Sequence, residues 1–333
     1  MKVFLLIFGL LLLSSLLLEI GLRLLAGLGD PPLYIADSLM GYRLAPNQRV
    51  RRFGNRIQIN QYSMRGDPIT PQPAAATLRV LLLGDSIANG GWWTDQPQIL
   101  SAQIEHQLQE KLAAPYQQAE VLNASANSWG PRNELAYLIR FGLFEAQVVV
   151  LLLNTDDLFA IAPNSVQVGR DRSYPSRKPL TATAELLQRV LRKPKPLPEL
   201  QKLQDEPGDR VGANLEAIRQ IQQRVQAAAS QLIVAMTPLL REVEPPGPRD
   251  YEQTARARVE AFMRREQVAY LDFLADFQAA DIPAALYRDH IHLSPSGNEY
   301  VSQAIAAAIQ AQLQDSNALK LEKAPEAIDD DLW

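Results

Sequence analysis

The sequence predicts an α/β fold, a three-layer α/β/α sandwich built on a parallel sheet of five strands. Between residues 78 and 316, short apolar runs alternate with segments whose apolar side chains recur at helical spacing. This alternation is typical of a parallel sheet with helices on both faces. The expected strands, in chain order, are residues 78–83, 120–123, 148–153, 231–236 and 268–272.

Helical segments occupy the stretches between these strands. Ile104, Leu108 and Leu112 share one helical face, and residues 215–225 carry a second apolar stripe. Residues 296–313 are expected to form a closing helix. The order of these strands and helices is that of a flavodoxin-like domain.

The chain begins with a segment that predicts membrane attachment. After Lys2, residues 3–18 are almost entirely Leu, Ile, Val and Phe, with no charge before Glu19. The helix is long enough to span a membrane if Glu19 and Arg23 pair near its surface. Since no small-residue cleavage site follows, we expect residues 1–29 to be an uncleaved signal anchor in the cell membrane. The rest of the chain would then be periplasmic; a cleaved signal peptide is the alternative.

Three further segments frame the predicted domain. Residues 30–77 begin with Asp-Pro-Pro, which ends the anchor, and are expected to form short strands and a proline-containing linker. Residues 158–212 are an insertion rich in proline and basic residues, with one amphipathic helix near residues 185–192. The insertion is expected to be a lid or binding loop, or else a solvated surface excursion. The acidic tail, residues 317–333, is expected to be disordered.

The composition excludes several functions. The chain has 333 residues, of which 47% are hydrophobic, enough for a large core. A net charge of −4 argues against a general nucleic-acid binder. The absence of cysteine from the sequence excludes disulfides, thiolate metal sites and cysteine nucleophiles. No cofactor is expected, and the oligomeric state is left open.

Two short motifs at opposite ends of the domain carry the predicted chemistry. The first expected strand stops at Gly84, and Asp85-Ser86 follows where open α/β sheets bind their ligands. Gly-Asp-Ser alone is a weak signal, because these residues recur in helix-capping loops. The sequence Asp289-His290-Ile291-His292 near the other end strengthens it. Together the motifs resemble the GDSL (SGNH) hydrolase family, over residues 78–313.

The resemblance implies a serine esterase with a catalytic triad. Ser86 would be the nucleophile, His292 its general base, and Asp289 the acid that orients the base. His290 is a rival base, although the family's spacing favours His292. A metal site built from Asp289, His290 and His292 is a further alternative, although no other histidine or cysteine is at hand to complete the set of ligands. The Gly-x-Ser-x-Gly elbow of α/β-hydrolases is absent.

The resemblance also implies the donors that would stabilise an oxyanion. The family uses the amide of the nucleophile, here Ser86, a glycine amide replaced here by Ser125, and an asparagine side chain. This sequence has Asp156 in place of that asparagine, and an ionised carboxylate repels an oxyanion. Four interpretations remain open: burial protonates Asp156, Asn154 or Asn127 supplies the amide, activity on ordinary esters is weak, or Asp156 merely caps the following segment.

Aromatic and basic residues suggest a substrate class. Trp92, Trp93 and Trp129 fall in loops expected to surround Ser86, and indole faces stack on sugar rings, although packing beneath the loops is an equal alternative. The basic insertion would attract an acidic polysaccharide or lipid headgroups, or is simply solvated. We therefore predict a membrane-anchored, extracytoplasmic serine esterase or deacetylase for O-acetyl groups on an envelope or exported glycan. An O-acetyltransferase with the same triad and a catalytically weak glycan-binding or scaffold protein are the alternatives.

Overall fold

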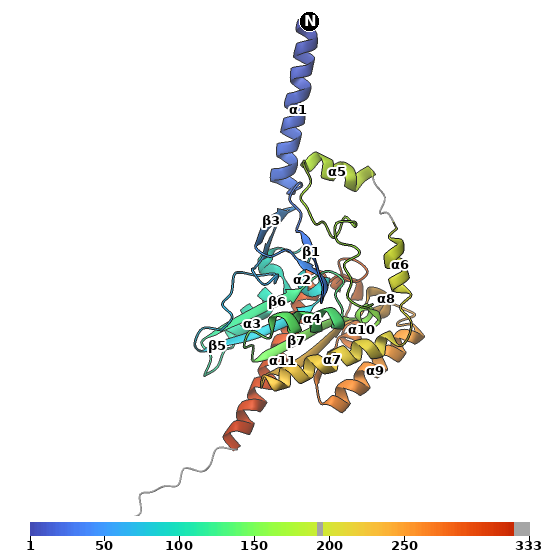
Figure 1. The fold of residues 1–333 in the computed structure, drawn as a ribbon. Helices are drawn as coiled ribbons and strands as arrows, with labels where there is room; N and C mark the ends of the chain where they lie inside the picture. The colour runs from blue at the N-terminus through green and yellow to red at the C-terminus, as the bar shows by residue number, and fades with distance from the viewer. Residues whose placement is uncertain (192–195, 323–333) are drawn as a thin grey trace, which may run out of the picture.

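The computed structural model describes residues 1–191 and 196–322, and it confirms the predicted fold class (Figure 1). Five parallel strands form the central sheet in the order β6-β5-β7-β8-β9. This is a flavodoxin-like order, whose direction reverses at β5. The strands are β5 (Thr77–Gly84), β6 (Gln118–Ser125), β7 (Val148–Asn154), β8 (Gln231–Thr237) and β9 (Ala269–Asp272).

Helices cover both faces of the sheet and make the outer two layers. Every residue of β5 and β7 is buried, which is why these runs are continuously apolar rather than alternating. Leu81 and Leu83 of β5 pack into the core on one face, and Val80 and Leu82 into the core on the other. The first face is covered by α4 (Pro131–Phe141), α7 (Arg210–Ala227) and α9 (Asp250–Glu266), and the second by α3 (Leu100–Glu110) and α11 (Pro295–Glu322).

Short helices lie in the loops between the strands and the longer helices, several of them just after the carboxyl end of a strand. They are α2 (Ser86–Asn89), η1 (Gln96–Gln98), η2 (Thr155–Phe159), α8 (Leu240–Val243), α10 (Leu274–Gln278) and η3 (Pro283–Leu286).

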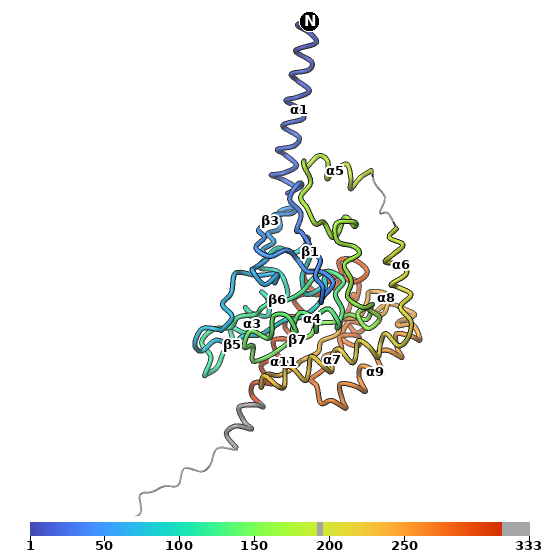
Figure 2. Tube along the Cα trace, in the orientation of Figure 1, coloured from blue at the N-terminus to red at the C-terminus, as the bar shows by residue number. Residues whose placement is uncertain are grey.

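The N-terminal helix α1 (Lys2–Ala26) projects away from the rest of the molecule (Figures 1 and 2). By length and composition it is able to cross a membrane, and none of its most apolar window is buried against the protein. The predicted pairing of Glu19 with Arg23 is present, with 2.7 Å between Oε1 and Nε.

Residues 30–77 form two antiparallel hairpins rather than a separate module. Met40, Tyr42 and Ile59 are buried in the same core that covers one face of the central sheet. The extension therefore packs as part of the same domain as the central sheet. The hairpin strands are β1 (Tyr34–Asp37), β2 (Gly41–Leu44), β3 (Gln48–Arg52) and β4 (Asn55–Ile59).

The insertion and the C-terminus complete the chain. The insertion contains α5 (Ala182–Leu191) and α6 (Pro198–Gln204), so the amphipathic helix expected there is present. Helix α11 is described as far as Glu322, within the segment 317–333 that is expected to be a disordered tail. The last part of the predicted tail, residues 323–333, lies outside the described residues, as do residues 192–195.

Candidate active site

Ser86 lies directly after β5, in the first position of α2. Gly84 is the last residue of the strand. Glycine is required there, because a Cβ would come within 2.9 Å of the backbone oxygen of Leu152 in β7. Asp85 caps α2 by accepting the backbone N–H of Ile87 at 2.8 Å. These constraints turn the chain sharply and leave the Ser86 hydroxyl at the carboxyl edge of the sheet, where the strand order reverses.

The structure brings Ser86, His292 and Asp289 into one hydrogen-bonded row. His292 Nε2 lies 2.9 Å from Ser86 Oγ, and His292 Nδ1 lies 2.9 and 3.0 Å from the two carboxylate oxygens of Asp289. Partial burial acts to raise the pKa of Asp289, but hydrogen bonds from the backbone and ring of His292 and from Ile291 N–H outweigh it and lower that pKa. An ionised Asp289 makes Nδ1 the donor, which leaves Nε2 free to accept the Ser86 proton.

The geometry distinguishes between the two candidate bases. The side chain of His290 is 85% exposed, and its Nδ1 lies 3.8 Å from Asp289 Oδ1. His292 reaches both partners, whereas His290 points into solvent from the same loop. Within residues 1–191 and 196–322, no group of three or more His, Asp or Glu side chains is arranged to hold a metal ion.

A second polar network lies beneath the nucleophile and occupies Asn154. The amide Nδ2 of Asn154 donates to Asp85 Oδ2 at 3.0 Å and to Asp157 Oδ2 at 2.9 Å. An amide has only two hydrogens, and both face these buried carboxyls. The prediction that Asn154 supplies an oxyanion donor is therefore wrong in this structure. Instead Asn154 holds the loop after β7 against the loop after β5.

Three buried carboxyl groups share this region. Burial raises the pKa of Asp85, and it raises the pKa values of Asp157 and Glu134 well above the ordinary range. The Asp85 carboxyl adds to the shifts of both Asp157 and Glu134, and Glu134 adds to that of Asp157. Both carboxyl oxygens of Glu134 lack a hydrogen-bonding partner among the described residues. The neutral forms are favoured as a result, which limits the negative charge beneath Ser86.

Asp156 faces the same cavity as Ser86 and His292. Its backbone N–H donates to Asn154 Oδ1 at 2.8 Å, so its backbone is part of the cap of η2 while its carboxyl remains in the cavity. Desolvation by the surrounding protein raises the pKa of Asp156, although the Arg241 guanidinium opposes the shift. A raised pKa favours the protonated carboxyl, which is the form of Asp156 that could donate a hydrogen bond.

Ser125 ends β6 and pairs in parallel register with Gly84, one strand away from the nucleophile. Its hydroxyl is turned into the core, where it donates to Asn123 Oδ1. Only the backbone amide of Ser125 is therefore a candidate donor. Asn127, two residues later, is half-buried, and its backbone oxygen accepts the Tyr42 hydroxyl at 2.6 Å.

The triad opens into a cavity of about 640 Å³, one wall of which is the insertion. Residues 159–164, together with Leu200 and Arg210, line this cavity along with Ser86 and His292. The insertion therefore contributes to the site, as the lid or binding-loop prediction requires. Tyr42, from the N-terminal hairpins, also lines the cavity, a contribution that no sequence motif indicated.

The three predicted tryptophans have different positions. Trp129 is 1% exposed and donates its indole N–H to the Tyr42 backbone oxygen at 3.0 Å, so its predicted contact with substrate is wrong. Trp93 packs on His292, with 4.4 Å between ring centroids. Trp92 is 37% exposed and packs edge-on against Trp93, and the Arg288 guanidinium lies over both indoles.

Arg65 is a buried supporting residue that the sequence did not reveal. Its guanidinium donates to the backbone oxygens of Asn89, Gly91 and Thr94, on the loop that carries Trp92 and Trp93. An arginine in a loop-rich segment has no distinguishing pattern, so only the packing identifies it. Arg65 fixes the loop on the tryptophan side of the triad.

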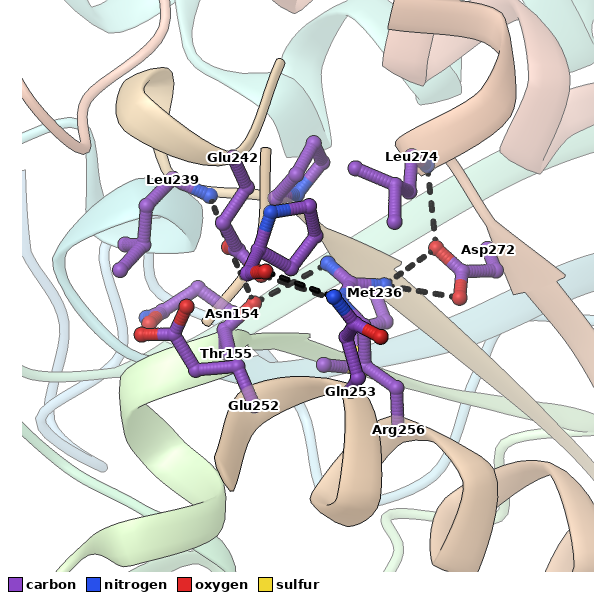
Figure 3. A network of polar contacts seen from close by, with 12 residues as sticks. Asn154, Thr155, Met236, Leu239, Glu242, Glu252, Gln253, Arg256, Asp272 and Leu274 are labelled. Atoms are coloured by element: carbon purple, nitrogen blue, oxygen red, sulfur yellow. Dashed lines mark hydrogen bonds and ion pairs between the residues drawn. The ribbon is translucent and has the colours of Figure 1, made fainter. Parts of the chain in front are cut away.

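A network of ion pairs and hydrogen bonds supports the loop after β7 (Figure 3). The guanidinium of Arg256, on α9, contacts both oxygens of Asp272 at 2.6 and 2.7 Å and Glu242 Oε1 at 3.1 Å, and donates to Thr155 Oγ1 at 3.0 Å. Thr155 Oγ1 in turn donates to Glu242 Oε2 at 2.6 Å. Because Thr155 separates Asn154 from Asp156, this network positions both residues.

Comparisons with solved structures find weak similarities. The acetylxylan esterase Axe2 from Geobacillus stearothermophilus, in a catalytic mutant, is 15% identical with a TM-score of 0.45, over 70% of this chain and 94% of the other. The acetyl xylan esterase AlAXEase is 14% identical with a TM-score of 0.46, over 69% and 99%. LAE5, an alpha/beta hydrolase enzyme from the metagenome of Lake Arreo, is 14% identical with a TM-score of 0.44, over 71% and 96%. A comparison with curated proteins finds no match.

The match to a protein family is more informative. The GDSL-like Lipase/Acylhydrolase family model matches residues 82–300, which is most of the chain and includes both motifs of the triad. The chain therefore belongs to the GDSL-like lipase/acylhydrolase family and is an ester-hydrolysing serine hydrolase.

Proposed function

We propose that this protein is a membrane-anchored esterase that removes O-acetyl groups from a glycan outside the cytoplasm, through an acyl-enzyme on Ser86. The observation that carries the proposal is the row Ser86–His292–Asp289, in which each pair of atoms lies within 3.0 Å. Helix α1 is long and apolar enough to cross a membrane, which supports the proposed anchoring. The short N-terminal end that carries Lys2 would then lie on the cytoplasmic side.

In the proposed reaction, Ser86 Oγ attacks the acetyl carbonyl while His292 Nε2 takes the hydroxyl proton. The new bond from Oγ to carbon forms, and the bond from carbon to the sugar oxygen breaks as His292 returns its proton to that oxygen. Water then attacks the acetyl-enzyme by the same route and acetate leaves. Asp289 holds the imidazole in the required tautomer and stabilises the imidazolium.

The oxyanion formed during attack requires donors on the opposite side of the carbonyl. We propose the backbone amides of Ser86 and Ser125 for this role, with the carboxyl of Asp156, in its protonated form, in place of the family's asparagine at pH values below its raised pKa. Trp93 lies beside His292 and Trp92 beside Trp93, and the exposed part of Trp92 is the proposed contact for a sugar ring.

The substrate assignment is tested with esters of different acyl length. The groups next to Ser86 are polar, because Asp85 and Asn154 lie beneath it and His292 contacts it, although the cavity also has apolar lining residues such as Phe159 and Leu200. A long acyl chain would bury apolar surface against these polar groups, so we expect acetyl esters to be cleaved at least about tenfold faster than octanoyl esters. The measurement is kcat/KM on p-nitrophenyl esters, followed by acetate release from acetylated xylo-oligosaccharides by the full chain in detergent. Faster cleavage of the octanoyl ester would identify a lipase-like enzyme instead.

Replacing Asp156 by asparagine tests the oxyanion assignment. The raised pKa of Asp156 means that the carboxyl is a neutral donor below that pKa and a repelling carboxylate above it. Asparagine donates at every pH, and one such donor is worth about 100–1,000-fold in rate. We therefore expect the ratio of D156N to wild-type kcat to rise with pH and to exceed about tenfold at alkaline pH. A ratio near one that does not vary with pH would exclude Asp156 from the oxyanion site.

A further inference from the structure

Helix α5 of the insertion is fastened to the base of α1, although the two are far apart in the sequence (Figures 1 and 2). The carboxylate of Glu19 in α1 accepts the backbone N–H groups of Ala182 and Thr183 at 2.8 and 3.0 Å. It thereby caps the N-terminus of α5, while Arg23 neutralises it from the same helix at 2.7 Å. The position of α5 is therefore fixed relative to α1.

The contacts that α5 makes with the protein are largely polar, although Ala182 is also buried. Glu185 is buried, and it accepts the backbone N–H of Gly29 at 2.6 Å and forms ion pairs with Arg52 and Arg189. Arg52 also donates to the backbone oxygen of Gly27, at the end of α1. The inner contacts of α5 are thus hydrogen bonds and ion pairs to the junction between α1 and the domain.

The opposite side of α5 is apolar and uncovered. Leu187, Val190 and Leu191 lie at i, i+3 and i+4 on one helical face, and they are 51%, 71% and 71% exposed. Leu180, just before the helix, is 95% exposed. A helix on the surface of a water-soluble domain has the reverse pattern, with its apolar stripe inward and its charges outward.

The outward face of α5 lies at the depth expected for a membrane surface. The hydrocarbon core of a bilayer requires about 20 helical residues. Counted from Lys2, this length ends between Glu19 and Arg23, the part of α1 that caps α5. The exposed Arg177 precedes α5 and suits anionic headgroups, whereas the neighbouring Lys178 is paired with Asp30 at 2.6 Å.

We propose that α5 is an interfacial helix that lies on the lipid surface and inserts Leu187, Val190 and Leu191 among the lipids. Such helices bury their apolar face by about 5–10 Å at the boundary of headgroups and acyl chains. The inference rests on the proposed membrane anchoring by α1. With two membrane contacts joined through Glu19, the catalytic domain is held at one height and orientation instead of swinging on a single tether.

The absence of cysteine from the sequence allows a direct test in the full chain. Val190→Cys, labelled with the fluorophore NBD, is reconstituted into nanodiscs of phosphatidylcholine and phosphatidylglycerol. We expect a blue-shifted emission that doxyl-labelled phosphatidylcholine quenches at least twofold and that aqueous iodide does not quench. The matched control is Leu203→Cys on α6, an exposed leucine of the same insertion, which should respond to iodide alone.

Leu10→Cys in α1 separates this inference from the proposed anchoring. Doxyl lipid that quenches Leu10→Cys while iodide quenches Val190→Cys would overturn the interfacial role of α5 and leave the anchor standing. Lack of lipid quenching at both positions would overturn the anchor as well. A Val190→Cys label protected from both quenchers would show that protein, not lipid, covers α5, and would also contradict the proposal. Esterase activity of the labelled chains confirms that each is folded.

Discussion

Replacing Ser86 by alanine is expected to lower kcat on a small acetyl ester by at least about a thousandfold. The variant loses the atom that bonds to the acyl carbon, while the cavity and the His292–Asp289 pair remain. His292→Ala should have a comparable effect, since Ser86 Oγ then has no base within reach. The two changes together should cost little more than either alone, because the residues act as one unit.

The measurement combines steady-state kinetics with labelling by a fluorophosphonate, which bonds to an activated serine oxygen as fluoride leaves. Wild-type protein should be labelled, S86A should not, and H292A should be labelled far more slowly. His106→Ala is the matched control, because His106 is exposed and lies outside the triad. Persistent labelling of S86A would point to another nucleophile, and a wild-type protein that resists labelling at every pH would refute the serine mechanism.

Replacing Arg256 by methionine is expected to destabilise the protein by about 3–5 kcal/mol. The side chain of Arg256 is 7% exposed, and Glu242, its partner, is completely buried. Methionine keeps much of the volume but leaves the Glu242 carboxylate without its cation, and an uncompensated buried charge is costly. The free energy of unfolding is measured from urea denaturation followed by circular dichroism.

Arg264→Met is the control for this change, on the same helix α9. Arg264 is 74% exposed and pairs with Glu260 at 2.6 Å, so its loss should cost about 0–1 kcal/mol. Equal losses for the two variants would mean that the Arg256 network contributes no more than a surface ion pair. R256M should also lower kcat, because Thr155 loses a donor and the loop carrying Asn154 and Asp156 loses its support.

The elements that were predictable from the sequence are those whose signal is local. Strands β5, β7 and β8 were identified because strands buried on both faces are uninterrupted apolar runs, whereas β6 and β9 are less buried and carry a weaker signal. Helix α1 was identifiable for a similar reason, and its Glu19–Arg23 pair follows from helical spacing. Helices α4 and α9 were not identified, since their apolar positions are diluted by charged residues such as Glu134 and Arg256.

Other features depend on contacts between distant segments and have no local signal. Nothing in the sequence around Arg65 or Tyr42 indicates that the N-terminal hairpins support and line the cavity. Trp129 and Trp93 look alike in sequence, yet one is a core residue and the other packs on His292. Burial decides between these roles, and burial is set by what folds over a residue.

The sequence alone determined the class of chemistry, an ester-hydrolysing serine hydrolase, and predicted its location: a strand that ends in Gly84-Asp85-Ser86, and an Asp289-x-x-His292 motif expected to supply a base. It could not choose His292 by geometry, because His290 is adjacent to Asp289 in the chain and is an equally plausible base by residue type. Only the tertiary structure decided that choice, through the 2.9 Å between Nε2 and Ser86 Oγ. It also committed both amide hydrogens of Asn154 to buried carboxyls. The physical reason is that a motif specifies residue types, whereas proton transfer and hydrogen bonding depend on distances that the packing of the whole domain sets.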